Sequence, residues 1–207
     1  MKFKSQLLIL SIVGAVTMSC KDSSKPFIIL NGSHNHTISL NSTYSEPGAV
    51  ATDDKDGDIS SAIAITGTVN PDQKGEYHLY YNVSDESGND APVVIRNVNV
   101  VNDADYLEGF YIATPNCGAT SQTNYSSTVS SSETQNNKIF IDQLETGNTI
   151  ITSAIVNNNT LTLANQGAIN NWQYSGTGTI VSTGFSLNTI YNSAGYTLNC
   201  STVFTKQ

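Results

Sequence analysis

Four aspartates lie within six positions of one segment, and their oxygen atoms could hold a metal ion. They are Asp53, Asp54, Asp56 and Asp58. Carboxylate oxygens suit Ca²⁺, but an EF-hand loop with Gly57 sixth would put Thr52 first and Ile63 twelfth, where acidic ligands are needed. Two interpretations stay open. One is a looser calcium site, completed by Glu46 or Asp85 from a neighbouring loop, and the other is an acidic turn that Asp side chains stabilise through their own backbone.

Residues for catalysis are sparse. All three histidines precede residue 102, so Cys117 and the serines of the second half have no imidazole in their own half to activate them. The pair His34 and His36 could form half of a zinc or copper site, but no third ligand is evident. A Gly-x-Ser-x-Gly motif, a phosphate loop and a dinucleotide fingerprint are absent. We therefore expect a protein that is not an enzyme, with no catalytic residues and no cofactor other than the calcium considered above.

Aromatic side chains of the second half are candidate ligand-binding residues. Trp172 and Tyr174 share one face of an alternating segment, and Tyr191 and Tyr196 flank the last turn. An exposed aromatic ring can stack on a sugar or an apolar ligand, whereas barrels also use large aromatics to fill their interior. Ligand binding and core packing both remain open for these four residues.

The amino terminus reads as a secretory leader. Lys2 and Lys4 precede an apolar run over residues 7–16, which as a helix would span roughly 15 Å, half of a hydrocarbon core. Residues 1–19 are therefore predicted to be a signal peptide rather than a membrane span. The small residue before Cys20 resembles the lipobox of bacterial lipoproteins, which implies that Cys20 is acylated and anchors the chain. An ordinary signal with an incidental cysteine is the alternative.

Residues 20–25 then form a polar tether, and the exported chain is more acidic than the formal charge of −8 because the leader removes two lysines. Nucleic acid is therefore excluded as a partner, since it is bound by clustered Lys and Arg. In an oxidising compartment the remaining cysteines, Cys117 and Cys200, are predicted to form a disulfide.

Alternating apolar residues and frequent Gly, Asn and Ser turns predict an all-β chain of two domains. In the first domain, residues 26–102, we expect strands at 27–30, 37–40, 62–66, 76–84 and 93–101. Its motifs run in the order Tyr44-x-Glu46-Pro47-Gly48, Asp56-Gly57-Asp58, Gly75-x-Tyr77, Tyr81-x-Val83-x-Asp85-x-x-Gly88-Asn89, Arg96-x-Val98-x-Val100. This order resembles the bacterial surface immunoglobulin-like domain, which is also repeated in some insecticidal crystal toxins. The resemblance implies a small β-sandwich that acts as a spacer or adhesive module.

In the second domain, residues 103–207, strands are predicted at 107–113, 124–131, 138–144, 150–156, 160–164, 172–181, 184–191 and 197–205. Eight strands joined by short turns make an up-and-down meander, which removes its edges by curling into a barrel or half-barrel. The motifs Leu107-Glu-Gly-x-Tyr111, Gly176-Thr-Gly-Thr-Ile180 and Tyr196-x-x-x-Cys200 resemble a lipocalin-like domain of lipoproteins from Bacteroidota.

These features together predict a lipid-anchored protein on the periplasmic or cell-surface face of a bacterial outer membrane. Its partners would be the membrane, through the lipid, and a glycan, small ligand or protein, through the second domain. A purely structural or adhesive lipoprotein and an accessory subunit of a polysaccharide-uptake system are the alternatives. An open cavity lined by Trp172, Tyr174 and Tyr191 would favour ligand binding, and a filled interior would favour the structural role.

Overall fold

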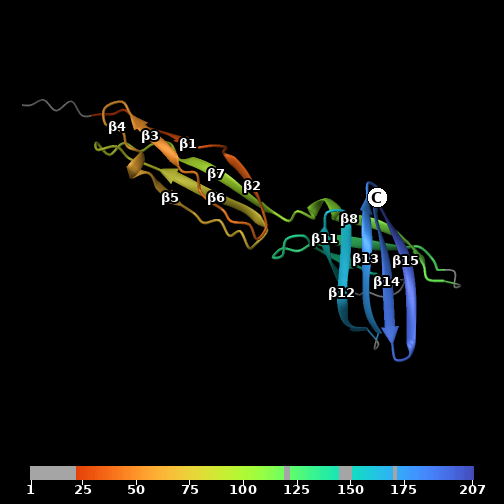
Figure 1. The fold of residues 1–207 in the computed structure, drawn as a ribbon. Coiled ribbons are helices and arrows are strands. Elements are labelled where there is room, and N and C mark those ends of the chain that lie inside the picture. Colours follow the sequence, from red (N-terminus) through yellow and green to blue (C-terminus); the bar gives the residue numbers. More distant parts are fainter. Residues whose placement is uncertain (1–21, 119–121, 145–150, 170–171) are drawn as a thin grey trace, which may run out of the picture.

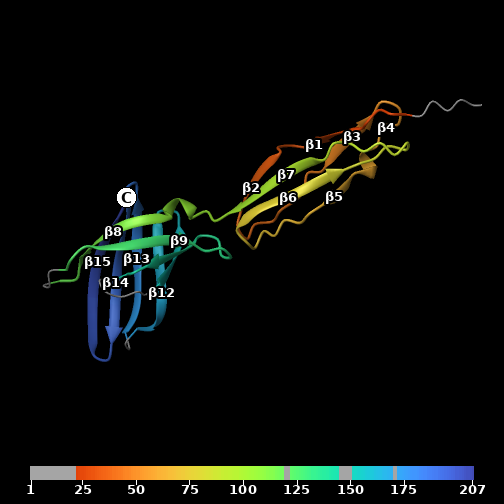
Figure 2. The same cartoon turned by 180° about the vertical axis from the view of Figure 1, so that it is seen from behind.

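The computed structural model describes residues 22–118, 122–144, 151–169 and 172–207, with only the backbone at 167–169 and 172. Two β domains lie end to end in an elongated molecule, joined by a short connection between β7 (Val94–Val101) and β8 (Gly109–Asn116) (Figure 1). The reverse view shows the same separation (Figure 2). The all-β prediction is confirmed. Within the described ranges no helix is long and apolar enough to cross a membrane.

The first domain is a sandwich of two sheets, with strand orders β1-β3-β4 and β2-β7-β6-β5. Neighbouring strands pair antiparallel, except that β2 and β7 pair in parallel. A short 3-10 turn, η1 (Ser60–Ala62), precedes β5. The remaining strands are β1 (Phe27–Leu30), β2 (Asn35–Ser39), β3 (Ala49–Asp53), β4 (Gly57–Asp58), β5 (Ala64–Thr66) and β6 (Gly75–Asn82).

Strands β3 and β4 correct the sequence analysis, which predicts no strand between residues 41 and 61. β3 pairs with β1 so that Ala51 lies opposite Ile28, and burial alternates along it to place Ala51 and Asp53 inside. Adjacent aspartates and a glycine are weak strand formers. Pairing with β1 therefore decides the conformation here, and no local pattern in the sequence reveals that pairing.

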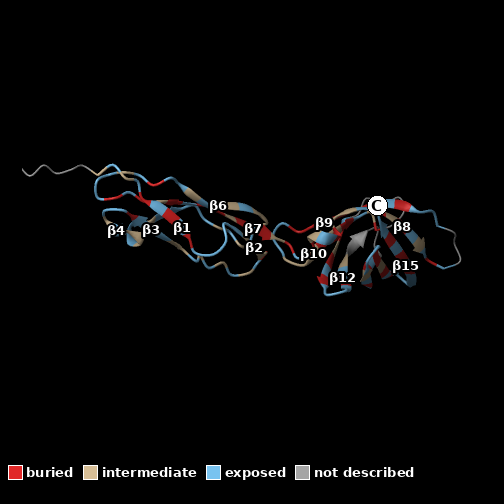
Figure 3. Ribbon diagram, turned by 90° about the horizontal axis from the view of Figure 1, so that it is seen from above, coloured by how far each residue is buried: buried red, intermediate tan, exposed pale blue. Residues whose placement is uncertain are grey.

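The second domain is a closed antiparallel barrel in which each strand pairs with the next and β15 returns to β8. This confirms the meander and shows that it closes fully. Alternate residues along the strands are buried, as period-two side-chain orientation requires (Figure 3). Besides β8, the strands are β9 (Tyr125–Ser131), β10 (Lys138–Asp142), β11 (Ile151–Asn157), β12 (Thr160–Ile169), β13 (Trp172–Val181), β14 (Gly184–Ser193) and β15 (Tyr196–Lys206).

Strand β12 is five residues longer than predicted, because two register shifts between Leu163 and Ile169 carry it through the polar Asn165-Gln166 pair. The opposite strand β13 carries the Gly176-Thr-Gly178 motif. A Cβ at Gly176 would lie 2.5 Å from the carbonyl oxygen of Asn188, and one at Gly178 would lie 2.3 Å from that of Ser186. The two glycines therefore allow β13 and β14 to approach each other closely in a tightly coiled sheet.

A disulfide between Cys117 and Cys200 lies at the seam where the first and last strands of the barrel meet. Cys117 directly follows β8 and Cys200 lies within β15, so the bond joins neighbouring strands that are 83 residues apart in the chain. The predicted pairing is thus present in the structure, and it holds the barrel closed.

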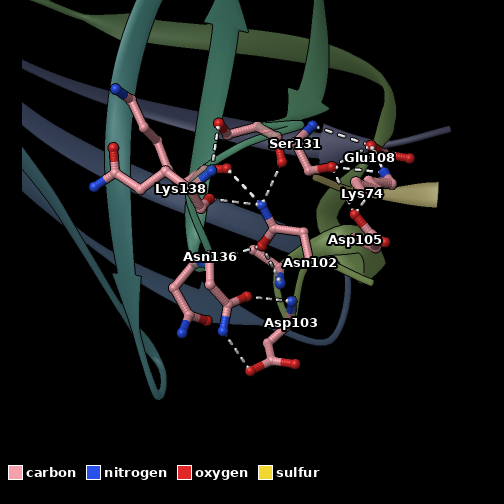
Figure 4. Close-up of polar contacts among 12 residues, drawn as sticks. Lys74, Asn102, Asp103, Asp105, Glu108, Ser131, Asn136 and Lys138 are labelled. Atoms are coloured by element: carbon pink, nitrogen blue, oxygen red, sulfur yellow. Dashed lines mark hydrogen bonds and ion pairs between the residues drawn. The ribbon is translucent and has the colours of Figure 1, made fainter. Parts of the chain in front are cut away.

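The domains meet at a polar joint, formed by Lys74, Asn102, Asp105, Glu108 and Ser131 (Figure 4). The Nζ atom of Lys74 lies 2.8 Å from Asp105 Oδ1, 3.1 Å from Glu108 Oε1 and 2.8 Å from Ser131 Oγ. Asp105 begins the 3-10 turn η2 (Asp105–Leu107), and Ser131 ends β9. One lysine of the first domain therefore contacts two separate segments of the second.

Asn102 completes the polar joint from the connection itself. Its buried amide donates to the backbone carbonyls of Ser132, Gln135 and Lys138, at 2.9, 3.0 and 3.3 Å. Its side-chain oxygen accepts hydrogen bonds from two further backbone N–H groups. The turn between β9 and β10 is thereby fixed against the connection between the domains.

Candidate functional site

One end of the barrel, the base, is filled with apolar side chains. The rings of Phe185 and Phe204 stack with centroids 4.5 Å apart, and Tyr111 lies 5.1 Å from Phe185. All three are fully buried, as are Leu161 and Leu187. Burial raises the pKa of Tyr111 to about 12, so its phenol stays neutral. The base is also the end from which β8 leaves the polar joint, so it faces the first domain.

The opposite end, the mouth, has a different lining. Tyr174 and Tyr191 lie with ring centroids 6.2 Å apart, and the Thr152 hydroxyl donates to the Tyr174 oxygen at 3.2 Å. Thr152, Thr189 and the tyrosines are buried. Hydroxyl groups thus replace the hydrocarbon of the base, which gives this half of the barrel neutral hydrogen-bonding capacity.

A cavity of about 360 Å³ lies at the mouth, which is within the range of sites for small ligands. Tyr125, Tyr191 and the Cys117–Cys200 disulfide form part of its wall, with amide and hydroxyl groups from Gln122 and Thr202. The remaining lining residues are Pro115, Thr123, Leu144 and Leu198. None of these described lining residues carries a formal charge, so the cavity suits a neutral ligand with both apolar and hydroxyl surfaces.

The four predicted aromatic residues do not form one site. Tyr191 lines the cavity, whereas Tyr174 packs behind it within the buried interior. Tyr196 is 75 % exposed at the start of β15, away from the lining. The Trp172 side chain and the predicted lipidation residue Cys20 lie outside the described residues. Sequence reasoning missed Tyr125, whose buried ring directly precedes a polar, serine-rich segment that gives no aromatic signal.

A second hollow, of about 630 Å³, crosses β8 and β12 to β15. Its floor includes Gly176, and its outward-facing lining is composed of Asn, Ser and Thr with one isoleucine. These residues are Asn116, Thr162, Ser175, Thr177, Asn188, Ile190, Asn199 and Ser201. It is open to solvent, most of its exposed surface is apolar despite the polar residue types, and no aromatic ring is among its described lining residues.

The structure does not bring the four predicted aspartates together. Asp53 ends β3 and is 2 % exposed, whereas Asp54 and Asp58 are exposed and Asp56 donates its backbone N–H to Asp53. The described part of the chain holds one group of three close metal-binding side chains, in which Asp53 joins Asp22 and Asp85. Among the described residues, His34 and His36 do not belong to such a group of three.

The first domain contains a buried ionic network that sequence reasoning lists only as separate motif residues. Arg96 is fully buried, and its Nε lies 3.0 Å from Glu46 Oε1. Tyr44 and Tyr81 donate hydroxyl hydrogen bonds to the Glu46 carboxylate. Burial raises the pKa of Glu46, but these hydrogen bonds, the Gly48 N–H and the Arg96 charge outweigh it, so the pKa is lowered overall. The network orders the sandwich, and two of its members, Tyr44 and Glu46, also line a hollow of about 650 Å³.

Comparison with known proteins identifies the first domain. Residues 28–100 match the family model described as bacterial surface protein, Ig-like domain. The first domain is a bacterial surface Ig-like domain, as its motifs predict, and the match indicates a protein of the cell envelope. A search of curated proteins gave no match.

Two solved structures are similar to the chain at low identity. One is the crystal structure of a lipoprotein from Bacteroides thetaiotaomicron, with 18% identity and a TM-score of 0.37, covering 88% of this chain and 100% of that one. The other contains CBM51-2 in complex with GlcNAc and INT domains from Clostridium perfringens ZmpB. It has 20% identity and a TM-score of 0.31, and covers 83% of this chain and 30% of that one.

Proposed function

We propose that this chain is a non-catalytic, lipid-anchored protein of the bacterial outer membrane, whose barrel binds a small neutral ligand at its mouth. The anchor rests on the lipobox-like sequence before Cys20. The Ig-like domain acts as the spacer between this anchor and the barrel. The acidic net charge of the whole chain and its scarcity of basic residues argue against nucleic acid as a partner.

The observation that carries the ligand proposal is the cavity of about 360 Å³ at the mouth. A barrel that served only as a structural unit would gain stability by filling this volume with side chains, as its base does. The mouth instead holds tyrosine, threonine and glutamine groups around open space. Sugars present hydroxyl groups and an apolar ring face together, and so we take a glycan as the first candidate ligand.

The position of the cavity supports the same proposal. The barrel strands extend between the base, which lies at the polar joint, and the mouth at the opposite end. The first domain therefore does not cover the mouth. The polar joint fixes the barrel on its spacer through Lys74 and Asn102. A ligand held away from the membrane could therefore reach the cavity without movement of the two domains.

The test is a glycan array on the purified chain, followed by two tryptophan substitutions on β15. Leu198 lines the cavity and is 38% exposed, whereas Val203 points out of the barrel and is 50% exposed. Leu198→Trp should block the cavity and weaken binding of an array hit at least tenfold, while Val203→Trp should leave it unchanged. Equal effects of both variants, or no glycan bound by the native chain, would overturn glycan binding at the mouth. Metabolic palmitate labelling that survives Cys20→Ala would overturn the anchor.

A further inference from the structure

A group of three carboxylates lies at the end of the Ig-like domain farthest from the barrel. Asp22 comes from the first described residues, Asp53 ends β3, and Asp85 lies in the turn between β6 and β7. Figure 1 shows the amino-terminal segment and β4 together at this end. One oxygen atom of each carboxylate lies within 4.8 Å of the others. We name this group the apical carboxylate cluster.

Two oxygens of the cluster lack a hydrogen-bond donor although they are buried. Asp53 is 2 % exposed, and its Oδ1 accepts the N–H groups of Lys55 and Asp56 at 2.9 and 3.1 Å, while Oδ2 has no partner. Asp22 repeats this arrangement, because its Oδ1 accepts from the backbone N–H and hydroxyl of Ser24 and its Oδ2 is buried without a partner. A buried carboxylate oxygen without a partner is destabilising unless a cation or donor reaches it.

The third carboxylate is held rigidly. Asp85 is 7 % exposed, and its two oxygens accept hydrogen bonds from the backbone N–H and the side-chain amide of Asn89, both at 2.7 Å. The Asn89 amide also donates to the backbone carbonyl oxygen of Asp22 at 3.2 Å. The turn therefore positions Asp85 and the amino-terminal segment together, so the cluster is preformed by contacts that do not use the free oxygens.

We propose that the apical carboxylate cluster binds one Ca²⁺ ion through Asp22, Asp53 and Asp85. Calcium–oxygen bonds are about 2.3–2.6 Å long, so two oxygens on one ion are at most about 5 Å apart, which agrees with the spacing of the cluster. The donors are all oxygens, which disfavours zinc, and Mg²⁺ is bound less readily because it retains its waters. Three carboxylates supply ample charge for a dication, with water completing its coordination.

The site would link the tether to the folded domain. Asp22 is two residues after Cys20 in the sequence, and the other two ligands belong to the sandwich. A bound ion would fix the chain to the domain directly beside the proposed lipid anchor. It would thereby restrict the directions that the rod of two domains takes from the membrane, an effect that is independent of ligand binding at the mouth.

The direct test is calorimetric titration of CaCl₂ into the full-length chain in detergent, with MgCl₂ in parallel. We expect one calcium site, with a dissociation constant of about 10⁻⁴–10⁻³ M as in other extracellular modules, and weaker binding of magnesium. Asp22→Asn should weaken calcium binding at least tenfold, since it removes a ligand on the tether without touching the core. Asp54→Asn is the matched control, because Asp54 is exposed beside the site, and it should change the affinity less than twofold.

A second variant, Asp53→Asn, separates loss of the ion from loss of the fold. It should abolish calcium binding while near-ultraviolet circular dichroism stays native. Its melting temperature should no longer rise when calcium is added, whereas that of the native chain should rise. Absence of calcium binding by the native chain at 10 mM, or equal effects of Asp22→Asn and Asp54→Asn, would overturn the proposal.

Discussion

The Ig-like domain and the barrel both have an apolar core, but their largest buried side chains differ in chemistry. In the first domain the largest fully buried side chain is Arg96, which pairs with Glu46 and donates to the carbonyl oxygens of Asn31 and Gly48 at 2.9 and 3.1 Å. In the barrel the equivalent places are taken by Phe185 and Phe204, and a disulfide joins the closing strands. The Ig-like domain adds these directional polar contacts to an apolar core, whereas the barrel combines apolar packing with a covalent bond.

The difference relates to what each domain must do. Hydrogen bonds from one guanidinium to several loops fix those loops in single positions, which suits a rigid spacer. The barrel leaves the mouth partly empty, and each unfilled volume lowers its stability. The covalent bond across the seam offsets that loss of stability, so we expect the disulfide to compensate for the unfilled cavity.

The largest expected effect is on the barrel, from loss of the disulfide. Replacing Cys117 and Cys200 by alanine opens a loop with a sequence separation of 83 residues. The chain-entropy relation gives a loss of about 4–5 kcal/mol in the free energy of unfolding. Denaturant unfolding followed by the fluorescence of Trp172, the single tryptophan and a residue of β13, would measure it.

The Ig-like domain provides the control, because it contains neither cysteine. Its transition, followed by circular dichroism, should shift by less than about 1 kcal/mol in the same variant. An equal loss in both domains would show that the seam does not stabilise the barrel selectively. The disulfide would then not compensate for the unfilled mouth.

The second effect should fall on the Ig-like domain alone. Arg96→Met leaves Glu46 without its ion pair and leaves the loop carbonyls without donors, so we expect a loss of about 3–5 kcal/mol. Glu76→Gln, on the exposed face of β6, is the control for a change of one charge, and it should be nearly neutral. An Arg96→Met loss below about 1 kcal/mol would contradict a polar centre that holds this domain.

The sequence predicts much of the barrel and less of the sandwich. Each barrel strand pairs with the next in the chain, so period-two alternation is enough to place them, and β13 has the predicted bounds. Strand β3 pairs across the chain with β1, which local pattern cannot reveal. Asp22, Asp53 and Asp85 are 63 residues apart from first to last, so only the folded sandwich shows that they form one group. The four aspartates within six positions are the stronger local signal, and three of them lie outside that group.

The smallest effect concerns the contact between the two domains. Partial burial lowers the pKa of Lys74, but hydrogen bonds to Asp105 and Glu108 outweigh it and raise the pKa overall. Hydrogen bonds from Ser131 lower the pKa of Glu108 more than burial raises it, and Lys74 adds to the shift. The contribution of Lys74 to the stability of the polar joint is therefore complete below pH 10.5, its ordinary pKa. That contribution is lost as the pH rises through the raised pKa of Lys74. The contribution of Glu108 to the stability of the polar joint is complete above pH 4.5, its ordinary pKa. It is lost as the pH falls through the lowered pKa of Glu108.

Lys74→Met should therefore weaken the coupling between the domains by about 1 kcal/mol near pH 7, because its partners are partly exposed and solvent screens them. Lys25→Met, an exposed lysine of the amino-terminal segment, is the control. Small-angle scattering should report one fixed angle between the domains for the native chain and the control, and a broader distribution for Lys74→Met. The same broadening is expected for the native chain in strong acid or strong alkali. If Asn102 alone fixes the polar joint, the distribution of the angle between the domains will stay narrow in Lys74→Met and broaden only in Asn102→Ala. The ion pairs of Lys74 would then contribute nothing to the angle between the domains.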